Sequence, residues 1–380
     1  RVDLDAHDID DEPRRGPADA LRDALLDRLG SHCAVMTYRP STFLSAICFA
    51  RADKARYLGM FKDHQFAFEH KPWVESAVRL LGLPRVPWVY VSDREQARAA
   101  ECIQRGPVVL RTSRSSGGTG VRRVDSGAEL ARAWPDEPEA FVSVAPFIDS
   151  ATPVNVGGVV WDDGVTVHFA SVQLIGIPAL TSRQFGYCGN DFGAIRDLGD
   201  EVIRDLERSV GTVGEWMRGL GYRGAFGVDF LVKDGTPLFT EVNPRFQGST
   251  HLSNLLSRSL GESCLFTDHL AALLHVPMPH RAPLVDRTRD LPAMSHFVAH
   301  WLAPSASGVD GYRLARAATA LPGLSHSDVL LSPNVVCAPG ATVGRFTMRR
   351  SITTTGFDVD PAVSRVVADL STANEGTLTR

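Results

Sequence analysis

The arrangement of apolar residues changes about a third of the way along the chain. In the first third, segments with helical spacing alternate with short apolar strands, as at 88–91 and 107–111. Such alternation predicts an α/β domain. Later, a long amphipathic helix over 202–220 precedes an antiparallel hairpin with arms at 225–232 and 237–242, which is an α+β arrangement. The chain is therefore expected to combine two differently built parts.

The two ends of the chain differ from this central region. Residues 1–19 carry seven acids and few apolar residues, which predicts a solvated lead-in. From about residue 285 the pattern is that of a smaller α+β unit whose last helix is capped by Asp360. The remaining expected strands lie at 141–148, 155–161, 165–177, 295–301 and 344–352.

Composition excludes several classes of protein. The 380 residues, 44% hydrophobic and 22% charged, suit a folded chain of two or three domains. A formal net charge of -4 provides no basic field for nucleic acid, and no apolar run approaches the roughly 20 residues of a membrane span. The six cysteines form no CxxC pair, so neither a disulfide framework nor a zinc site is indicated. We expect a soluble, cytoplasmic protein without a nucleic-acid or membrane partner.

A glycine-rich segment at 108–121 is the first candidate site. A strand ends at Arg111, a loop of small residues follows, and another strand begins near Val121. The uncovered N–H groups of such a loop can hold a phosphate chain while Arg111 or Arg114 neutralises its charge. The segment lacks the GxxxxGK[ST] pattern of a P-loop, and a plain hairpin connection is the alternative. The loop residues concerned are Ser115, Ser116, Gly117, Gly118, Thr119 and Gly120.

The hairpin at 227–249 carries a second candidate site. Glu241 and Asn243 are two residues apart on a strand and so share a face, while Asp229 on the preceding strand can oppose them. Two carboxylates and an amide are oxygen ligands that suit Mg²⁺. A surface charge ladder is the alternative, but the large apolar residues between them favour a covered face, where unpaired charge is costly.

Together these two segments resemble the ATP-grasp superfamily, over roughly residues 65–275. The resemblance implies an N-terminal α/β domain at 20–92, a small lobe at 93–147 and a large lobe at 148–284 that close on ATP, with a C-terminal lid or dimerisation module at 285–380. It implies ATP and two Mg²⁺ ions, which Mn²⁺ could replace, as cofactors, and a homodimer. By this resemblance, Lys71 corresponds to a lysine that contacts phosphate, and residues 115–120 correspond to the flexible loop that covers the phosphates. Pro146, Phe147 and Ile148 correspond to the strand that binds adenine, and Asn155 lies toward the ribose. The magnesium ligands correspond to Asp229, Glu241 and Asn243.

Two positions depart from the family pattern. Arg111 stands where the family usually has a lysine, and a planar guanidinium does not place its charge as an ammonium does. Ala145 and Pro146 replace an acidic pair that is common at the adenine strand, which leaves nucleotide preference less defined.

The resemblance also implies a reaction. A carboxylate attacks the γ-phosphate of ATP to give an acylphosphate, and an amine then displaces phosphate. Glu241 and Arg111 would act on the phosphates, and Arg245 would hold the substrate carboxylate and steady the oxyanion. The chain looks more similar to the stand-alone amino-acid and peptide ligases of bacterial natural-product pathways, of the pheganomycin type, than to purine-biosynthesis or carboxylase members of the family. Small amino-acid or peptide substrates are the expected partners.

The acceptor pocket is expected under the loop at 173–192. Its polar residues could bind an amino acid, with Asp191 binding an amine and Arg183 a carboxylate. A structural loop in which Asp191 caps the next helix is the alternative. The substrate-binding candidates are Arg183, Tyr187, Asn190, Asp191, Arg245, Ser249 and His251.

Three other functions stay open for the whole protein. These are a carboxylate–thiol ligase, a biotin-carboxylase-like enzyme and a non-catalytic ATP sensor.

Overall fold

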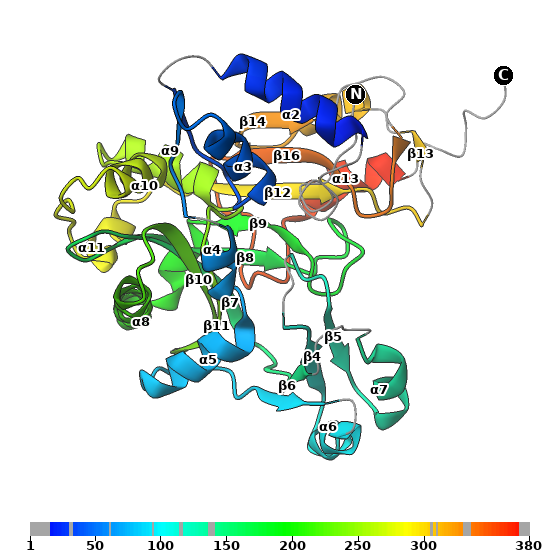
Figure 1. Ribbon diagram of the computed structural model, residues 1–380. Coiled ribbons are helices and arrows are strands. Elements are labelled where there is room, and N and C mark those ends of the chain that lie inside the picture. The colour runs from blue at the N-terminus through cyan, green and yellow to red at the C-terminus, as the bar shows by residue number, and fades with distance from the viewer. Residues whose placement is uncertain are drawn as a thin grey trace.

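Two antiparallel sheets, one small and one large, form the framework of the protein. The computed structural model describes residues 16–29, 33–60, 62–92, 95–113, 117–135, 141–304, 307–308, 311–329 and 336–371. The lobe built on the small sheet stands apart from the large sheet (Figure 1). Within the described residues, no helix is both long and apolar enough to cross a membrane.

The N-terminal part is a short α/β unit. Strands β1 (Cys33–Val35) and β2 (Ala55–Tyr57) pair in parallel, which fits an α/β unit. The strands at 88–91 and 107–111, from which an α/β domain was expected, belong instead to an antiparallel sheet. Every other strand pair in the described part of the chain is antiparallel. The helices of this part are α2 (Gly16–Arg28), α3 (Thr42–Ala50), α4 (Lys62–Ala67) and α5 (Lys71–Leu80).

The small lobe is a four-stranded sheet covered by two helices. Its strand order is β3-β6-β4-β5, and Leu110 and Val144 are fully buried at its centre. Strand β3 was expected in the N-terminal domain that ends at residue 92, but its backbone pairs with β6, so the lobe begins earlier in the chain. The elements are β3 (Val89–Val91), α6 (Gln96–Ile103), β4 (Val108–Arg111), β5 (Val121–Val124), α7 (Gly127–Ala133) and β6 (Val142–Pro146).

The large sheet has eight strands in the order β11-β10-β7-β8-β9-β12-β16-β14. The expected hairpin is its first pair, and the expected long helix is α8 (Asp200–Gly219), which buries an apolar face against β7 and β8. The strands are β7 (Thr152–Val160), β8 (Val165–Ile175), β9 (Tyr187–Asp191), β10 (Gly224–Lys233), β11 (Thr236–Asn243), β12 (Ser295–His300), β14 (Leu324–Val329) and β16 (Thr342–Met348).

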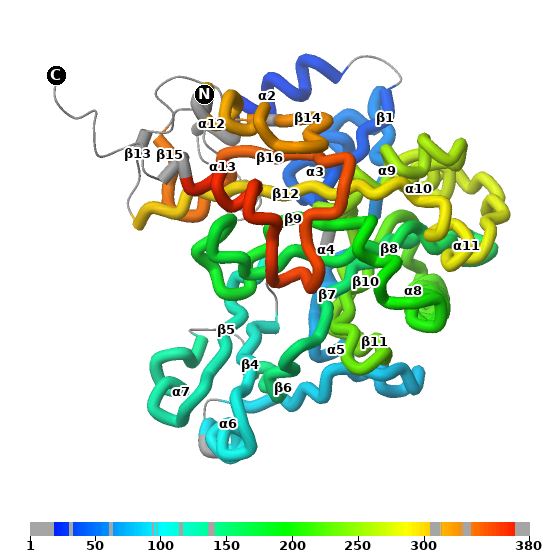
Figure 2. The backbone as a smooth tube through the Cα atoms, turned by 180° about the vertical axis from the view of Figure 1, so that it is seen from behind, coloured from blue at the N-terminus to red at the C-terminus, as the bar shows by residue number. Residues whose placement is uncertain are grey.

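The C-terminal part extends this sheet instead of forming a separate sheet. Strand β12 pairs with β9, so hydrogen bonding runs without a break across the boundary expected at residue 284. Phe297 and Phe346 stack here at 4.7 Å, with α12 (Gly311–Ala318) and α13 (Pro361–Ser371) packed on the same core. In both overall views α2 and α3 are drawn near β12, β14 and β16, whereas α5 lies beside β11 (Figures 1 and 2).

Shorter elements complete the fold. These are the 3₁₀ helix η2 (Ala194–Leu198), the helices α9 (Thr250–Ser259), α10 (Leu265–Leu273) and α11 (Leu284–Arg289), and the paired strands β13 (Ser307–Gly308) and β15 (Val336–Cys337).

Candidate active site

A cavity of about 590 Å³ lies where the small lobe meets the large sheet. The N-terminal part contributes Tyr38 and Arg39 to its lining, and the C-terminal part contributes Arg345. The predicted site residues that line it are Arg111, Gly117, Gly118, Pro146, Phe147, Ile148, Asn155, Tyr187, Asn190, Asp229, Glu241, Asn243, Arg245 and Ser249. Most residues predicted from two separate motifs thus share one cavity.

The acidic centre is formed by the first two strands of the large sheet. The register pairs Asp229 on β10 directly with Glu241 on β11, and Asn243 follows Glu241 on the same face, as strand periodicity predicts. The Asn243 amide donates a hydrogen bond of 3.0 Å to Asp229 Oδ2. The Asn155 amide from β7 donates to Asp229 Oδ1 at 2.5 Å. The carboxylate of Asp229 is therefore held by two neighbouring strands.

The two carboxylates of this centre titrate differently. Burial, together with the negative charge of Glu241, raises the pKa of Asp229 to about 7. Burial acts in the same direction on Glu241, but the positive charges of Lys71 and Arg111 outweigh it and lower the pKa of Glu241. Glu241 is therefore ionised at neutral pH while Asp229 is poised to release a proton when a cation approaches.

These residues fit a Mg²⁺ ion bound together with phosphates. Within the described residues, no group of three or more His, Cys, Asp or Glu side chains could by itself hold a metal ion. Mg²⁺ instead takes one or two carboxylates and completes its shell with phosphate oxygens and water. A buried carboxylate pair with one strongly raised pKa is the donor set that such a cation would relieve of repulsion.

Two basic residues adjoin the acidic centre. The Lys71 ammonium lies 3.5 Å from Glu241 Oε2 and is 6% exposed, and burial lowers its pKa. Lys71 borders Glu241 and is not among the residues that line the cavity. Arg111, by contrast, lines the cavity from the end of β4, where its Nη1 donates to the carbonyl of Thr240 at 3.1 Å.

Arg245 lies at the other side of the acidic centre. Its Nε donates to Glu69 Oε1 at 2.9 Å, and its Nη2 donates to Asn243 Oδ1 at 3.0 Å. These two bonds orient the guanidinium at the cavity wall and leave Nη1 without a partner among the described residues. The sequence prediction of an arginine beside the metal ligands agrees with this position.

The glycine loop of the small lobe packs against the large lobe. Gly118 approaches the backbone of Phe185 so closely that a Cβ at this position would lie 2.0 Å from the Phe185 carbonyl oxygen. Arg183 donates to Thr119 Oγ1 at 3.3 Å, next to that contact. The described part of the loop, residues 117–120, is therefore closed against the large lobe at the cavity. Ser115 and Ser116, which were also predicted to bind phosphate, lie outside the described residues.

Several predicted substrate residues have other roles. Asp191 is buried and accepts bonds from the backbone N–H groups of Gly193 and Ala194, both at 2.9 Å, and of Ile352 at 2.6 Å. It is a structural cap, the alternative left open by the sequence, and the prediction that it binds an amine is wrong. His251 is exposed and is not among the lining residues.

Other predicted residues are placed differently from expectation. Asn155 was expected near a ribose, but its amide bonds Asp229 and Gln247, and its carbonyl accepts from Ser249 at 2.8 Å. Its side chain therefore belongs to the acidic centre. Arg183 and Gly120 do not line the cavity, and Arg183 instead ties its loop to Thr119.

Tyr187 and Asn190 form a polar wall at one end of the cavity. Tyr187 donates to Asn190 Oδ1, and its hydroxyl lies 2.9 Å from His296 Nε2 on β12. Burial lowers the pKa of His296 to about 3, and the charge of Arg345 adds to the effect, so the ring is neutral at neutral pH. This wall therefore combines Tyr187 and Asn190, from the segment predicted to cover the acceptor, with His296 on β12 of the C-terminal part.

Sequence reasoning missed several lining residues. Gln173 on β8 donates to Asp229 Oδ1 at 3.3 Å, and the available signal was a polar amide within the mostly apolar strand predicted at 165–177. Trp88 and Arg345 carried no local signal, because only the packing of distant strands brings them to the cavity.

Comparisons with known proteins agree with this arrangement. Residues 79–249 match the model of the ATP-grasp domain. A formate-dependent phosphoribosylglycinamide formyltransferase from Synechococcus sp. (strain CC9311) is 28% identical over 205 residues, which is 52% of this chain and 49% of that protein. The chain thus spans about half the length of such curated relatives.

Two solved structures share the architecture. The carboxyaminoimidazole ribonucleotide synthase from Aspergillus clavatus complexed with ATP gives a TM-score of 0.60 at 15% identity, covering 94% of this chain and 91% of that one. The biotin carboxylase from Campylobacter jejuni gives 0.59 at 15% identity, covering 93% and 77%. With the two lobes and the cavity between them, these likenesses show that the chain has the ATP-grasp fold, within which residues 79–249 match the model of the ATP-grasp domain.

Proposed function

We propose that the protein is an ATP-dependent ligase that joins a carboxylate to an amine. The carboxylate oxygen would attack the γ-phosphorus of ATP and release ADP; the amine nitrogen would then attack the acyl carbon, lose a proton and release phosphate. The observation that carries the proposal is that the acidic centre of Asp229, Glu241 and Asn243 faces the closed glycine loop across one cavity. The names of the relatives, a formyltransferase and a ribonucleotide synthase, are consistent with acyl transfer to an amine.

The residues of the cavity supply binding and charge for such a reaction. Gly117 and Gly118 would donate backbone N–H groups to phosphate oxygens, and Arg111 would add positive charge beside them. Two Mg²⁺ ions, when bound by Asp229, Glu241 and Asn243, would offset charge on the transferred phosphoryl group. Lys71 keeps Glu241 ionised for this purpose.

Arg245 would hold the substrate carboxylate. Its Nε and Nη2 groups are occupied by Glu69 and Asn243, so the guanidinium is fixed and the remaining Nη1 hydrogens can meet an oxygen in the cavity. The same charge would steady the oxyanion formed when the amine attacks.

For the substrates we propose an amino-acid-like or peptide carboxylate and amine. The support is the sequence resemblance to peptide ligases of the pheganomycin type and the polar wall of Tyr187 and Asn190 at one end of the cavity. The acceptor is proposed to be a small molecule, and the assembly a homodimer in the cytoplasm.

Phosphate release from Mg-ATP tests the function. The screen presents amino acids and small peptides in pairs, with formate, bicarbonate and a phosphopantetheinyl thiol as alternatives, and mass spectrometry identifies the product. Glu241→Ala and Arg245→Ala are expected to abolish substrate-dependent phosphate release with the fold retained, because each removes a charge from the reacting centre. Glu201→Ala, exposed on α8, is the control and should be fully active. Activity retained in either site variant would overturn the assignment.

A further inference from the structure

Arg111 is held on three sides by protein groups. Its Nη2 donates to Glu75 Oε1 on α5, its Nη1 donates to the Thr240 carbonyl on β11, and its guanidinium lies 3.9 Å from the centre of the Trp88 ring. Arg111 and Glu75 are each 4% exposed. A planar cation bound at two edges and one face has little freedom to rotate.

Glu75 is itself fixed from the opposite side. Tyr90 on β3 donates its hydroxyl hydrogen to Glu75 Oε2. Burial raises the pKa of Glu75, and Arg111 is the chief influence in the other direction. A buried carboxylate of this kind is stable only beside its partner charge. Glu75, Tyr90 and Arg111 therefore form one buried unit that joins α5 to the small sheet.

One donor of Arg111 is not used by the protein. Its Nε–H is buried and has no partner in the described structure, although Arg111 lines the cavity. A buried donor without an acceptor costs about 1–3 kcal/mol. A lysine ammonium is not planar, so it could neither stack on Trp88 nor bond Glu75 and Thr240 with the geometry of a guanidinium. These three contacts are therefore specific to arginine.

We propose that Glu75 is a positioning residue for nucleotide binding, which holds the guanidinium of Arg111 at the cavity wall so that its positive charge faces the phosphates of ATP or ADP. The proposal rests on the proposed function, since it assumes that the cavity binds a nucleotide. It explains how arginine serves at a position where the fold usually carries a lysine: an acid on α5 and two aromatic side chains supply the geometry.

The affinity of the full-length protein for Mg-ADP, measured by calorimetry, tests this inference. Glu75→Gln keeps the size of the side chain and removes its charge, and it is expected to raise the Kd about tenfold, the value of one charge-assisted hydrogen bond. In an Arg111→Lys background the same substitution should change the Kd by less than about twofold, because Glu75 acts only through Arg111. Adenosine, which lacks phosphates, should bind the wild type and Glu75→Gln equally.

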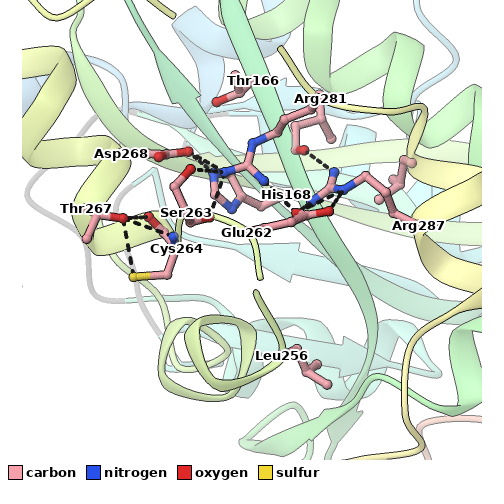
Figure 3. Close-up of polar contacts among 12 residues, drawn as sticks. Thr166, His168, Leu256, Glu262, Ser263, Cys264, Thr267, Asp268, Arg281 and Arg287 are labelled. Atoms are coloured by element: carbon pink, nitrogen blue, oxygen red, sulfur yellow. Dashed lines mark hydrogen bonds and ion pairs between the residues drawn. The ribbon is translucent and has the colours of Figure 1, made fainter. Parts of the chain in front are cut away.

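A buried ion-pair cluster away from the cavity provides the matched control. Glu262 bonds Arg281 and Arg287 beside the buried pair of His168 and Asp268 (Figure 3). Glu262→Gln removes a charge from this cluster, so it should lower the melting temperature without changing the Kd for Mg-ADP. If Glu75→Gln does not fold, Tyr90→Phe removes only the hydroxyl that fixes Glu75 and should raise the Kd about threefold.

The outcomes are distinct. An unchanged or lower Kd in Glu75→Gln, or an equal effect of that substitution in the Arg111→Lys background, would refute the positioning role. If the wild type does not bind Mg-ADP, the proposed function fails and the inference falls with it. A raised Kd that depends on Arg111, with unchanged adenosine binding, supports the inference.

Discussion

Closure of the glycine loop can be tested with two adjacent residues. Gly117 and Gly118 both have positive φ angles, of 60° and 79°, so alanine at either position is strained by about 1–2 kcal/mol. A Cβ on Gly118 would lie 2.0 Å from the carbonyl oxygen of Phe185 in the large lobe, whereas a Cβ on Gly117 would meet no atom within 4 Å. Gly117→Ala is therefore the matched control for Gly118→Ala.

The expected difference follows from these distances. Ordinary contact needs about 3.4 Å, so in Gly118→Ala the loop must move back by more than 1 Å. Two loop N–H groups donating to phosphate contribute about 1.5–3 kcal/mol each, so losing both weakens Mg-ATP binding about 100-fold or more. Gly117→Ala carries only the backbone strain, and its Kd should rise by at most about 30-fold.

Calorimetric titration with a non-hydrolysable ATP analogue and Mg²⁺ measures both variants. Their melting temperatures should fall by similar amounts, since the backbone strain is common to both. Equal affinities in Gly117→Ala and Gly118→Ala would refute the reasoning, because the closed contact with Phe185 would then contribute nothing to binding.

Two further predictions concern buried carboxylates. Because burial and Glu241 raise the pKa of Asp229 to about 7, folded Asp229 holds its proton more tightly than the unfolded chain does; its stabilising contribution is therefore present below about pH 4 and lost as pH rises through about 7. Urea unfolding without Mg²⁺ should show this loss of stability in the wild type but not in Asp229→Asn. The affinity of the wild type for Mg-ADP should rise from pH 6 to pH 8. If neither the stability nor the affinity of the wild type changes with pH, the assignment is contradicted. Asp191→Ala should lower the free energy of unfolding by about 3 kcal/mol or more, because several buried N–H groups lose their acceptor. Nucleotide affinity should stay unchanged, exposed Asp197→Ala serves as the control, and a selective loss of affinity would restore Asp191 to the binding site.

Much of the acidic centre could be predicted from local periodicity. Glu241 and Asn243 share a face because strand side chains alternate, and a short hairpin turn returns the chain so that Asp229 opposes Glu241. The helix α8 was equally predictable, since its buried residues recur at helical spacing. These features depend on interactions between residues close together in the sequence.

The role of Asp191 could not be predicted in the same way. The Asp191 carboxylate accepts hydrogen bonds from the N–H groups of Gly193 and Ala194, which are close to it in the sequence. It also accepts from the N–H groups of Ile352 and Thr353, which belong to the C-terminal part. The sequence therefore left a substrate role and a capping role open, and only the packing of the C-terminal segment beside β9 decided between them.

The sequence by itself determined which residues could carry phosphate, metal and carboxylate chemistry, because strand alternation and glycine spacing are local properties. The tertiary structure decided which of them meet. Pairing of β12 with β9 brings Arg345 to the cavity, and pairing of β3 with β6 brings Tyr90 to Glu75. Such long-range strand pairing depends on the burial of whole faces of the sheets, which no short segment of the chain encodes.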